Sequence, residues 1–122
     1  MKIRLVDDDA CLRDMYATKF GELKHTVDVA ENAEIALAKL REQNYDAVLL
    51  DMIMPGMTGI DLLKRLKQEK VGGDPVCVML SNQSEEQDRV GALEAGAVGY
   101  IVKAERIPSE VVSEVLAFIA KK

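Results

Sequence analysis

The sequence lacks three features that would each point to a different class of protein. Its longest apolar runs, such as Ala47–Leu50 and Val76–Leu80, fall far below the roughly 20 residues that cross a membrane. The apolar stretch at the N-terminus is too short for a secretory signal peptide, and no small-residue cleavage site follows it. Acidic residues outnumber basic ones by 21 to 16, whereas a nucleic-acid-binding domain normally carries a basic excess. We therefore expect a cytoplasmic domain that contacts neither membrane nor nucleic acid.

Cysteine is scarce as well. Cys11 and Cys77 lie in apolar patterns, and their spacing is not that of a metal site. One disulfide between them is conceivable, but two buried, reduced cysteines that pack as small hydrophobic residues agree better with a cytoplasmic chain. No repeat, low-complexity segment or internal linker interrupts the 122 residues. Residues 1–122 are therefore expected to form a single domain with one core.

Strand-like segments alternate with segments of helical periodicity. The strand-like segments begin roughly 20–30 residues apart, as βαβ units do. They are Ile3–Val6, Thr26–Val29, Ala47–Leu50, Val76–Leu80 and Tyr100–Val102. Several are apolar throughout, which is typical of parallel strands covered on both faces. Five βα units of this kind predict an α/β fold with a doubly wound, five-stranded parallel sheet.

Each predicted helix carries an apolar stripe that should face the sheet. The stripes are Leu12, Met15, Tyr16 and Phe20; Ala33, Ala36, Leu37 and Leu40; Ile60, Leu63 and Leu66; Val90 and Leu93 with small residues; and Val112, Val115, Leu116 and Ile119. Thr58 with Asp61, and Ser84 with Gln87, have the spacing of N-terminal capping boxes. These pairs predict where the third and fourth helices begin.

Ionisable or hydroxyl groups follow four of the five strand-like segments. Asp7 and Asp8 follow the first, Asp51 the third, Ser81 the fourth and Lys103 the fifth. Ligands of doubly wound sheets bind outside the carboxyl ends of the strands, so these groups are expected at one edge. Clustered carboxylates repel one another, and Mg²⁺ held by their hard oxygen atoms relieves the repulsion. With an ammonium and a hydroxyl beside it, such a site suits an anionic, phosphate-like ligand.

At these residues the sequence resembles the receiver domain of two-component response regulators, over essentially the whole chain. Four segments carry the likeness in order: Leu5–Asp9, Val48–Gly59, Val78–Ser81 and Gly99–Lys103. The resemblance implies a flavodoxin-like (βα)5 fold with the strand order 2-1-3-4-5. It also implies Mg²⁺ as the cofactor, and a sensor histidine kinase or a phosphotransfer protein as the partner that supplies the phosphoryl group.

The resemblance assigns the chemistry of transfer to particular residues. Asp51 matches the phosphoacceptor, Ser81 the hydroxyl that binds the phosphoryl group, and Lys103 the lysine that pairs with it. Attack by Asp51 would form an acyl phosphate, and hydrolysis would reset the domain, so the chain would act on itself without turning over a metabolite. Tyr100 matches the switch aromatic that rotates inward behind Ser81. The surface of the fourth helix, fifth strand and fifth helix, where a downstream effector is expected to bind, would then change.

The metal ligands implied by the resemblance are also residues of this chain. Asp7 and Asp8 match the acidic pair, with Asp8 the more direct ligand and Asp7 acting partly through water. Asp51 and the backbone carbonyl of Ile53 complete the set. Asp9 lies outside the pair and is expected to have a surface role.

Some positions depart from the family pattern. Ala104 follows Lys103 where the family usually has proline, and a cis bond before alanine costs about 2.5–4 kcal/mol, so a trans bond is predicted. Asn82 stands where a small residue is usual, beside the expected phosphoryl site. Ile53 and Gln83 flank the path of attacking water and are expected to tune the lifetime of the phosphoryl group.

Two other functions remain open from the sequence. The run Asp7–Asp9 contains the D-x-D pattern of haloacid-dehalogenase-like phosphatases, although Ala10–Cys11 replaces the Gly-Thr that commonly follows it. The chain is also short for the cap and the last acidic motif of that family. A receiver-like binding scaffold that never carries phosphate is the other alternative, and the intact acidic set argues against it. Because the chain ends at Lys122, directly after the last predicted helix, a free-standing receiver and a piece of a longer regulator both fit.

Overall fold

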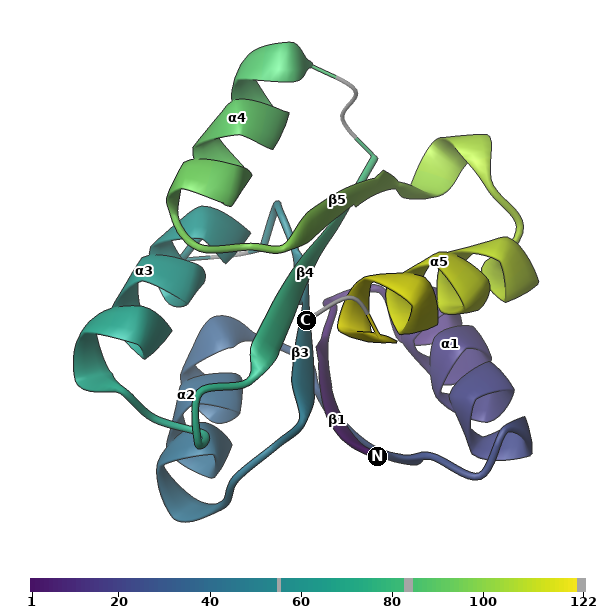
Figure 1. Ribbon diagram of the computed structural model, residues 1–122, viewed down its shortest axis with the longest axis horizontal. Helices are drawn as coiled ribbons and strands as arrows, with labels where there is room; N and C mark the ends of the chain where they lie inside the picture. Colours follow the sequence, from purple (N-terminus) through teal and green to yellow (C-terminus); the bar gives the residue numbers. More distant parts are fainter. Residues whose placement is uncertain (55, 83–84, 121–122) are drawn as a thin grey trace.

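The computed structural model describes residues 1–54, 56–82 and 85–120. Within these ranges, five strands alternate with five α-helices (Figure 1). The strands are β1 (Lys2–Val6), β2 (Thr26–Ala30), β3 (Ala47–Asp51), β4 (Val76–Ser81) and β5 (Gly99–Val102). The helices are α1 (Ala10–Glu22), α2 (Ala33–Glu42), α3 (Gly59–Glu69), α4 (Glu86–Glu94) and α5 (Pro108–Ala120), and a short 3₁₀ helix, η1 (Lys103–Glu105), joins β5 to α5. Every predicted strand is confirmed.

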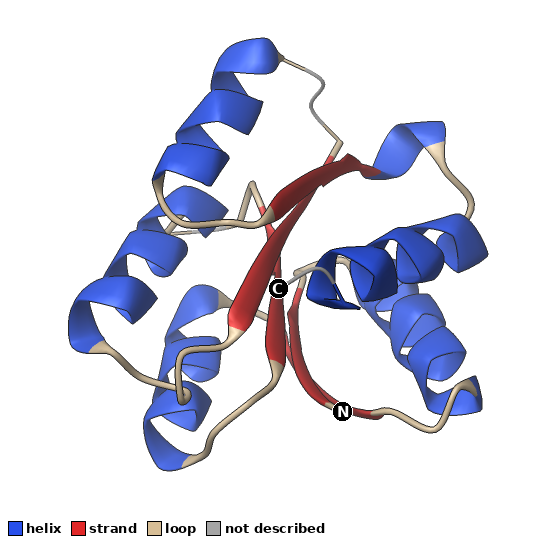
Figure 2. Ribbon diagram, in the orientation of Figure 1, coloured by secondary structure: helices blue, strands red, loops and turns tan. Residues whose placement is uncertain are grey.

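The strands form one parallel sheet in the order β2-β1-β3-β4-β5, which confirms the order that the resemblance implied. Figure 2 shows the helices in two layers, with α1 and α5 on one face of the sheet and α2, α3 and α4 on the other. The fold is therefore the doubly wound α/β fold predicted from the alternating pattern. In the part of the chain that the structure describes, no helix combines the length and apolarity needed to span a bilayer.

Alternate residues of the central strands enter two different apolar clusters. In β3, Ala47 and Leu49 pack toward α1 and α5, whereas Val48 and Leu50 pack toward α2 and α3. Successive side chains of a strand point to opposite faces, so a strand covered on both sides is apolar at every position. This double cover explains why the central segments Ala47–Leu50 and Val76–Leu80 show no polar alternation.

The predicted stripe of α2 is buried in full, but two other stripes are partly wrong. In α1, Tyr16 is buried and Met15 is exposed. In α4, Val90 and Leu93 are exposed and Ala92 is the buried residue. This helix therefore approaches the sheet through its small residues.

The predicted state of the cysteines is half right. Cys11 and Cys77 are both free thiols, as expected for reduced residues. Cys77 is buried in β4, but Cys11 is exposed, which corrects the prediction that both pack as core residues. The second residue of α1 faces solvent because the buried face of that helix begins later, at Tyr16.

Helix starts are confirmed at α3 and corrected at α4. Thr58 Oγ1 accepts a hydrogen bond of 3.1 Å from the backbone N–H of Asp61, the capping contact that the spacing predicted. Ser84, predicted to cap α4, lies outside the described residues. The residue before α4 is Glu85, whose side chain makes no capping hydrogen bond.

Gly59 lets α3 begin directly against the end of β3. Its N–H donates to the carbonyl of Met52 at 2.8 Å. A Cβ atom at this position would overlap the backbone carbonyl of Asp51, and it would lie 2.8 Å from Met79 Sδ. Glycine is needed here because of this close approach, which also fixes the backbone that carries Asp51.

We expect Gly59→Ala to lower the free energy of unfolding by about 2–3 kcal/mol, because the new methyl group meets rigid backbone. Urea unfolding followed by circular dichroism measures this change. Gly91→Ala is the matched control: its Cβ would lie 3.4 Å from Ile60 Cδ1, a contact close to ordinary, and alanine is the better helix former. Equal unfolding midpoints for Gly59→Ala and the parent would show that β3 and α3 tolerate a wider separation.

Candidate functional site

The predicted groups at the strand ends come together at one edge of the sheet. Asp7 directly follows β1, Asp51 ends β3, Ser81 ends β4, and Lys103 opens η1 directly after β5. The register pairs Asp51 with Leu80 and Ser81 with Val102, so neighbouring strands end level with one another. A pocket of about 280 Å³ opens at this edge. It is lined by Asp8, Asp9, Leu12, Asp51, Ile53, Ser81, Asn82 and Lys103.

Lys103 lies between two carboxylates. Its ammonium Nζ donates to Asp7 Oδ2 at 3.1 Å and lies 3.3 Å from Asp51 Oδ1. The residue is only 6% exposed. Burial by itself lowers the pKa of Lys103, but the attraction of Asp51 and Asp7 outweighs it, so the pKa is raised above its usual value. The ammonium therefore stays charged within the site.

The carboxyl group of Asp51 has an unusually high pKa. Burial raises this pKa most, Lys103 opposes the rise, and the negative charge of Asp7 adds to it, which brings the value to about 6. Asp7, Asp8 and Asp51 each offer an oxygen, and these three oxygens lie within 4.8 Å of one another. Three carboxylates against one ammonium leave an excess of negative charge that a divalent cation would neutralise.

Both carboxylate oxygens and the backbone carbonyl of Asp7 accept hydrogen bonds. Its Oδ1 accepts from the backbone N–H of Asp9 at 2.9 Å, and its Oδ2 accepts from Lys103. The guanidinium of Arg13 donates to the Asp7 backbone carbonyl at 3.0 Å. Both carboxylate oxygens of this fully buried residue are thus engaged, which fixes the side chain in place.

Asp9 and Arg13 support the site in ways that the sequence did not predict. Asp9 is the N-cap of α1, where its Oδ1 accepts from the N–H of Leu12 at 3.2 Å. An aspartate directly before the first apolar residue of a helix is a recognisable cap signal, so this role was open to prediction. The bond from Arg13 to a backbone carbonyl has no such signal in a single sequence.

Ser81 connects the pocket to β5. It is buried, and its hydroxyl shares a hydrogen bond with that of half-buried Tyr100. Burial raises the pKa of Tyr100, and the bond with Ser81 opposes that rise. Ser81 and Tyr100 are thus neighbours on the adjacent strands β4 and β5.

The other predicted positions lie at the rim or outside the described residues. The side chains of Ile53 and Asn82 are exposed at the mouth of the pocket. Gln83 lies outside the described residues. None of the described peptide bonds is cis, which confirms the predicted trans bond between Lys103 and Ala104.

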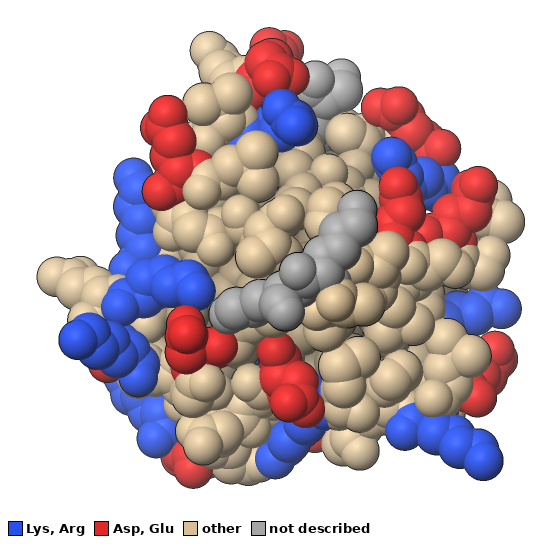
Figure 3. Space-filling view, in the orientation of Figure 1, with Lys and Arg blue, Asp and Glu red and all other residues tan. Residues whose placement is uncertain are grey.

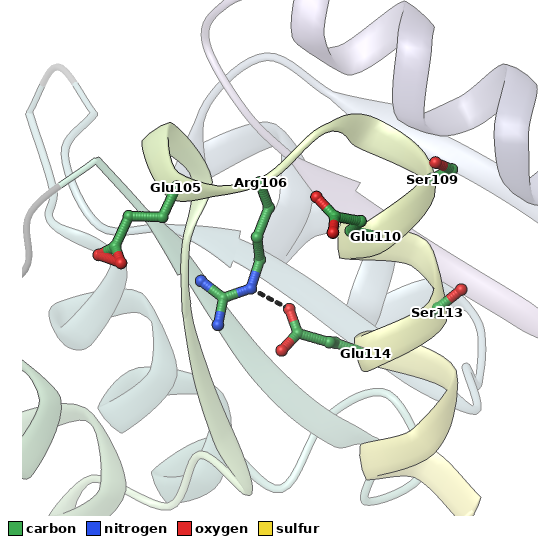
Figure 4. A pocket seen from close by; sticks show the side chains of 6 residues that line it. All are labelled: Glu105, Arg106, Ser109, Glu110, Ser113 and Glu114. Atoms are coloured by element: carbon green, nitrogen blue, oxygen red, sulfur yellow. Dashed lines mark ion pairs between the residues drawn. The ribbon is translucent and has the colours of Figure 1, made fainter.

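A second hollow, open and of about 600 Å³, lies apart from the strand-end groups. Figure 4 shows it between η1 and α5, where Arg106 reaches across to Glu114. Its lining is charged and polar: Glu105, Arg106, Ser109, Glu110, Ser113 and Glu114. It shares no residue with the pocket that contains Asp51.

Several charged residues elsewhere form surface ion pairs. On the face in Figure 3, basic side chains gather along the side where α3 lies. There Arg41 and Arg65 each pair with Glu69 at 2.9 Å, and Lys67 lies 3.5 Å from Asp74. These solvent-exposed pairs contribute little individually. Among the described residues, the buried charged side chains are those at the strand ends and Arg4 of β1, which lies 3.5 Å from Asp28.

Comparison with known proteins identifies close counterparts of this arrangement. The family model described as the response regulator receiver domain matches residues 3–115, which include every strand-end group. The transcriptional regulatory protein ResD of Bacillus subtilis is 39% identical over 120 residues, which cover 98% of this chain and 48% of that protein. The phosphate regulon transcriptional regulatory protein PhoB of Escherichia coli is 36% identical over 120 residues, 98% of this chain and 52% of that protein. The chain thus spans about half the length of these curated relatives.

A solved structure agrees with these sequence matches. The receiver domain of the Francisella response regulator 1452 is 27% identical and has a TM-score of 0.87. The alignment covers 98% of this chain and 97% of that one. The likeness therefore includes the whole fold as well as the strand-end segments.

Proposed function

The chain belongs to the response regulator receiver domain family of two-component signalling, and from that membership we propose that Asp51 is its phosphoacceptor. One observation carries the proposal: Asp51 lies in the pocket at the carboxyl edge of the sheet, 3.3 Å from Lys103 and clustered with Asp7 and Asp8. Residues 1–122 form a single receiver domain in this proposal. The two free thiols support a cytoplasmic location.

The chemistry follows from the residues around Asp51. A carboxylate oxygen of Asp51 attacks the phosphorus of a phosphohistidine on a sensor histidine kinase or phosphotransfer protein. The P–N bond breaks, the histidine nitrogen takes a proton, and an acyl phosphate forms on Asp51. The Lys103 ammonium neutralises charge on the phosphoryl oxygens, and Ser81 donates a hydrogen bond to one of them. Hydrolysis of the acyl phosphate by water resets the domain, so the regulator acts only on itself.

The donor set of the site fits Mg²⁺. Three carboxylates supply hard oxygen ligands within a small volume and leave excess negative charge. We assign Asp8, Asp51 and the backbone carbonyl of Ile53 as direct ligands. Asp7 acts partly through water, since both of its oxygens already accept hydrogen bonds. When bound, Mg²⁺ would neutralise negative charge on the phosphoryl oxygens during in-line transfer.

Mg²⁺ is expected to raise the midpoint of thermal unfolding by a few degrees, because it relieves carboxylate repulsion only in the folded state. Saturation at 100 times Kd corresponds to about 2.7 kcal/mol of stabilisation. Asp8→Asn should remove most of this rise. Asp14→Asn, at an exposed position of α1, should keep it. Equal rises in both variants, measured by circular dichroism, would contradict the assignment of Asp8.

The output of the domain is a change at the face of α4, β5 and α5. Ser81 moves toward the new phosphoryl oxygens, and Tyr100, its neighbour on β5, rotates inward behind it. Exposed apolar side chains on this face, Val90 and Leu93 of α4, support its use by a downstream effector. Ile53, Asn82 and Gln83 tune the lifetime of the phosphoryl group.

The geometry disfavours the phosphatase alternative. A haloacid-dehalogenase-like enzyme would use Asp7 as its nucleophile. Asp7 is fully buried, and both of its carboxylate oxygens are engaged by Asp9 and Lys103. Asp51 instead lines the pocket, where a phosphodonor has access.

Incubation with acetyl phosphate or phosphoramidate and Mg²⁺, followed by intact mass measurement, tests the proposed function. The chain should gain the mass of one phosphoryl group, and chelation of the metal should prevent the gain. Asp51→Asn should gain none, and the exposed-site control Asp61→Asn should behave as the parent does. No gain by the parent under any donor or metal condition would favour the binding-scaffold alternative.

A further inference from the structure

We propose that Arg106 is a positioning residue that holds Lys103 against Asp51, by fastening the end of β5 to α5 through Val102 and Glu114. The inference rests on the proposed function, because it concerns the placement of the ammonium that assists transfer to Asp51. It concerns a residue outside the phosphoryl pocket, in the second hollow (Figure 4).

Arg106 brackets Lys103 along the backbone. Its N–H donates to the carbonyl of Lys103 at 3.2 Å, and its guanidinium Nη1 donates to the carbonyl of Val102, also at 3.2 Å. Ala104 and Glu105, the two residues between Lys103 and Arg106, are exposed. The backbone on both sides of the Lys103 side chain is thus held by a single residue.

The other side of the guanidinium is fixed to α5. Arg106 Nε pairs with Glu114 Oε2, as Figure 4 shows. That oxygen is withdrawn from solvent and forms no hydrogen bond with any other described group, so the guanidinium is what compensates its charge. The two side chains are 30% and 40% exposed, about as shielded overall as the Arg41–Glu69 pair at 47% and 26%. What distinguishes the contact is that the Glu114 Oε2 atom that faces Arg106 is buried.

The start of α5 does not need this contact. The N–H of Ile107 donates to Glu110 Oε1 at 3.0 Å, so Glu110 already serves the helix terminus. Val111, Val112 and Val115 anchor α5 in the core beneath it. The Arg106 clamp, defined as its bonds to Val102 and Glu114, therefore links the Lys103 segment to a helix that is independently fixed.

Such a link matters because Lys103 must place one nitrogen near Asp7 and Asp51 together. Small misplacements of a charged group that assists transfer cost rate. Loss of the clamp would leave Lys103 in a short 3₁₀ segment with exposed neighbours. The ammonium would then spend less time in its productive position.

The test measures phosphorylation at saturating acetyl phosphate and Mg²⁺ in Arg106→Ala, Arg106→Lys and the control Arg65→Ala, which removes an exposed ion pair of α3. We expect Arg106→Ala to slow phosphorylation about tenfold, with an unfolding midpoint near that of Arg65→Ala. Arg106→Lys should remain slow, since Arg106 reaches Val102 and Glu114 from two different nitrogen atoms, Nη1 and Nε, held in a rigid planar group that lysine lacks. Full recovery by lysine would overturn the clamp, because charge alone would then suffice.

A double-mutant cycle shows whether Arg106 acts through Lys103. In a Lys103→Ala background, Arg106→Ala should leave the remaining rate unchanged. An equal slowing in both backgrounds would overturn the proposal. If the doubly substituted chain does not fold, hydrogen exchange of residues 102–106 decides instead. That exchange should rise in Arg106→Ala and stay at the parent level in Arg65→Ala.

Hydrogen exchange also separates this inference from the proposed function, since it needs no phosphodonor. If the parent gains no phosphoryl group, the proposed function fails, and faster exchange in Arg106→Ala still supports the clamp. Unchanged exchange in Arg106→Ala overturns the clamp even if Asp51 is phosphorylated normally.

Discussion

Replacing Lys103 with alanine is expected to slow phosphorylation of the chain by about 10²–10³-fold, the usual cost of removing one preorganised donor from a site of developing charge. Lys103 Nζ lies 3.1 Å from Asp7 Oδ2 and 3.3 Å from Asp51 Oδ1, so it already occupies the place where phosphoryl oxygens must be neutralised. The rate of mass gain with acetyl phosphate and Mg²⁺ measures the effect.

Lys64→Ala is the matched control for this substitution, because Lys64 is an exposed lysine of α3. Its phosphorylation rate should equal that of the parent. In Lys103→Ala, the unpaired carboxylates should also lower stability without metal, and Mg²⁺ should restore part of it. A folded Lys103→Ala chain that is phosphorylated at the parent rate would show that the lysine serves structure alone.

Asp51→Asn is expected to stabilise the metal-free protein at neutral pH by about 3 kcal/mol, because it removes a buried charge while keeping the shape of the side chain. The residue is 8% exposed, and its pKa is raised from 3.8 to about 6. Each pKa unit corresponds to about 1.4 kcal/mol. Urea unfolding of parent and variant with the metal chelated gives the difference.

The sign of the pH dependence follows from the same pKa. The folded parent binds the Asp51 proton more tightly than the unfolded chain does. The protonated carboxyl of Asp51 therefore makes its full contribution to the stability of the parent below pH 3.8, and this contribution is lost as the pH rises to about 6. The difference in free energy of unfolding between Asp51→Asn and the parent should therefore be absent below about pH 3.8. It should grow as the pH rises to about 6. Asp14→Asn, which neutralises an exposed group, should show no such trend. A pH-independent difference for Asp51→Asn would contradict burial of the Asp51 charge as the cause.

The architecture and the charged cluster followed from the sequence for a geometrical reason. Parallel strands end at a shared edge, so residues that directly follow strands are brought together whatever loops connect them. Asp7, Asp51, Ser81 and Lys103 each stand at such a position. The strand assignments alone predict that these residues share one edge, and the strand order that brings them close together was implied by the family resemblance.

Other features depended on packing that no local pattern contains. Met15 and Tyr16 are apolar neighbours that fit one helical stripe equally well, and only the position of α1 on the sheet decides which is buried. Val90 and Leu93 are exposed because α4 packs through smaller residues. The contact of Arg106 with Glu114 joins a loop to the second turn of a helix, without any periodic spacing to reveal it.

Identification of the residue that carries the phosphoryl group tests the central claim most directly. The parent chain would be incubated with acetyl phosphate and Mg²⁺, treated with borohydride to convert the acyl phosphate to a stable alcohol, digested and sequenced by tandem mass spectrometry. The conversion is expected at Asp51 and at no other carboxylate. Conversion at Asp7, or an unmodified Asp51 in a chain that has gained phosphate, would contradict the proposed function.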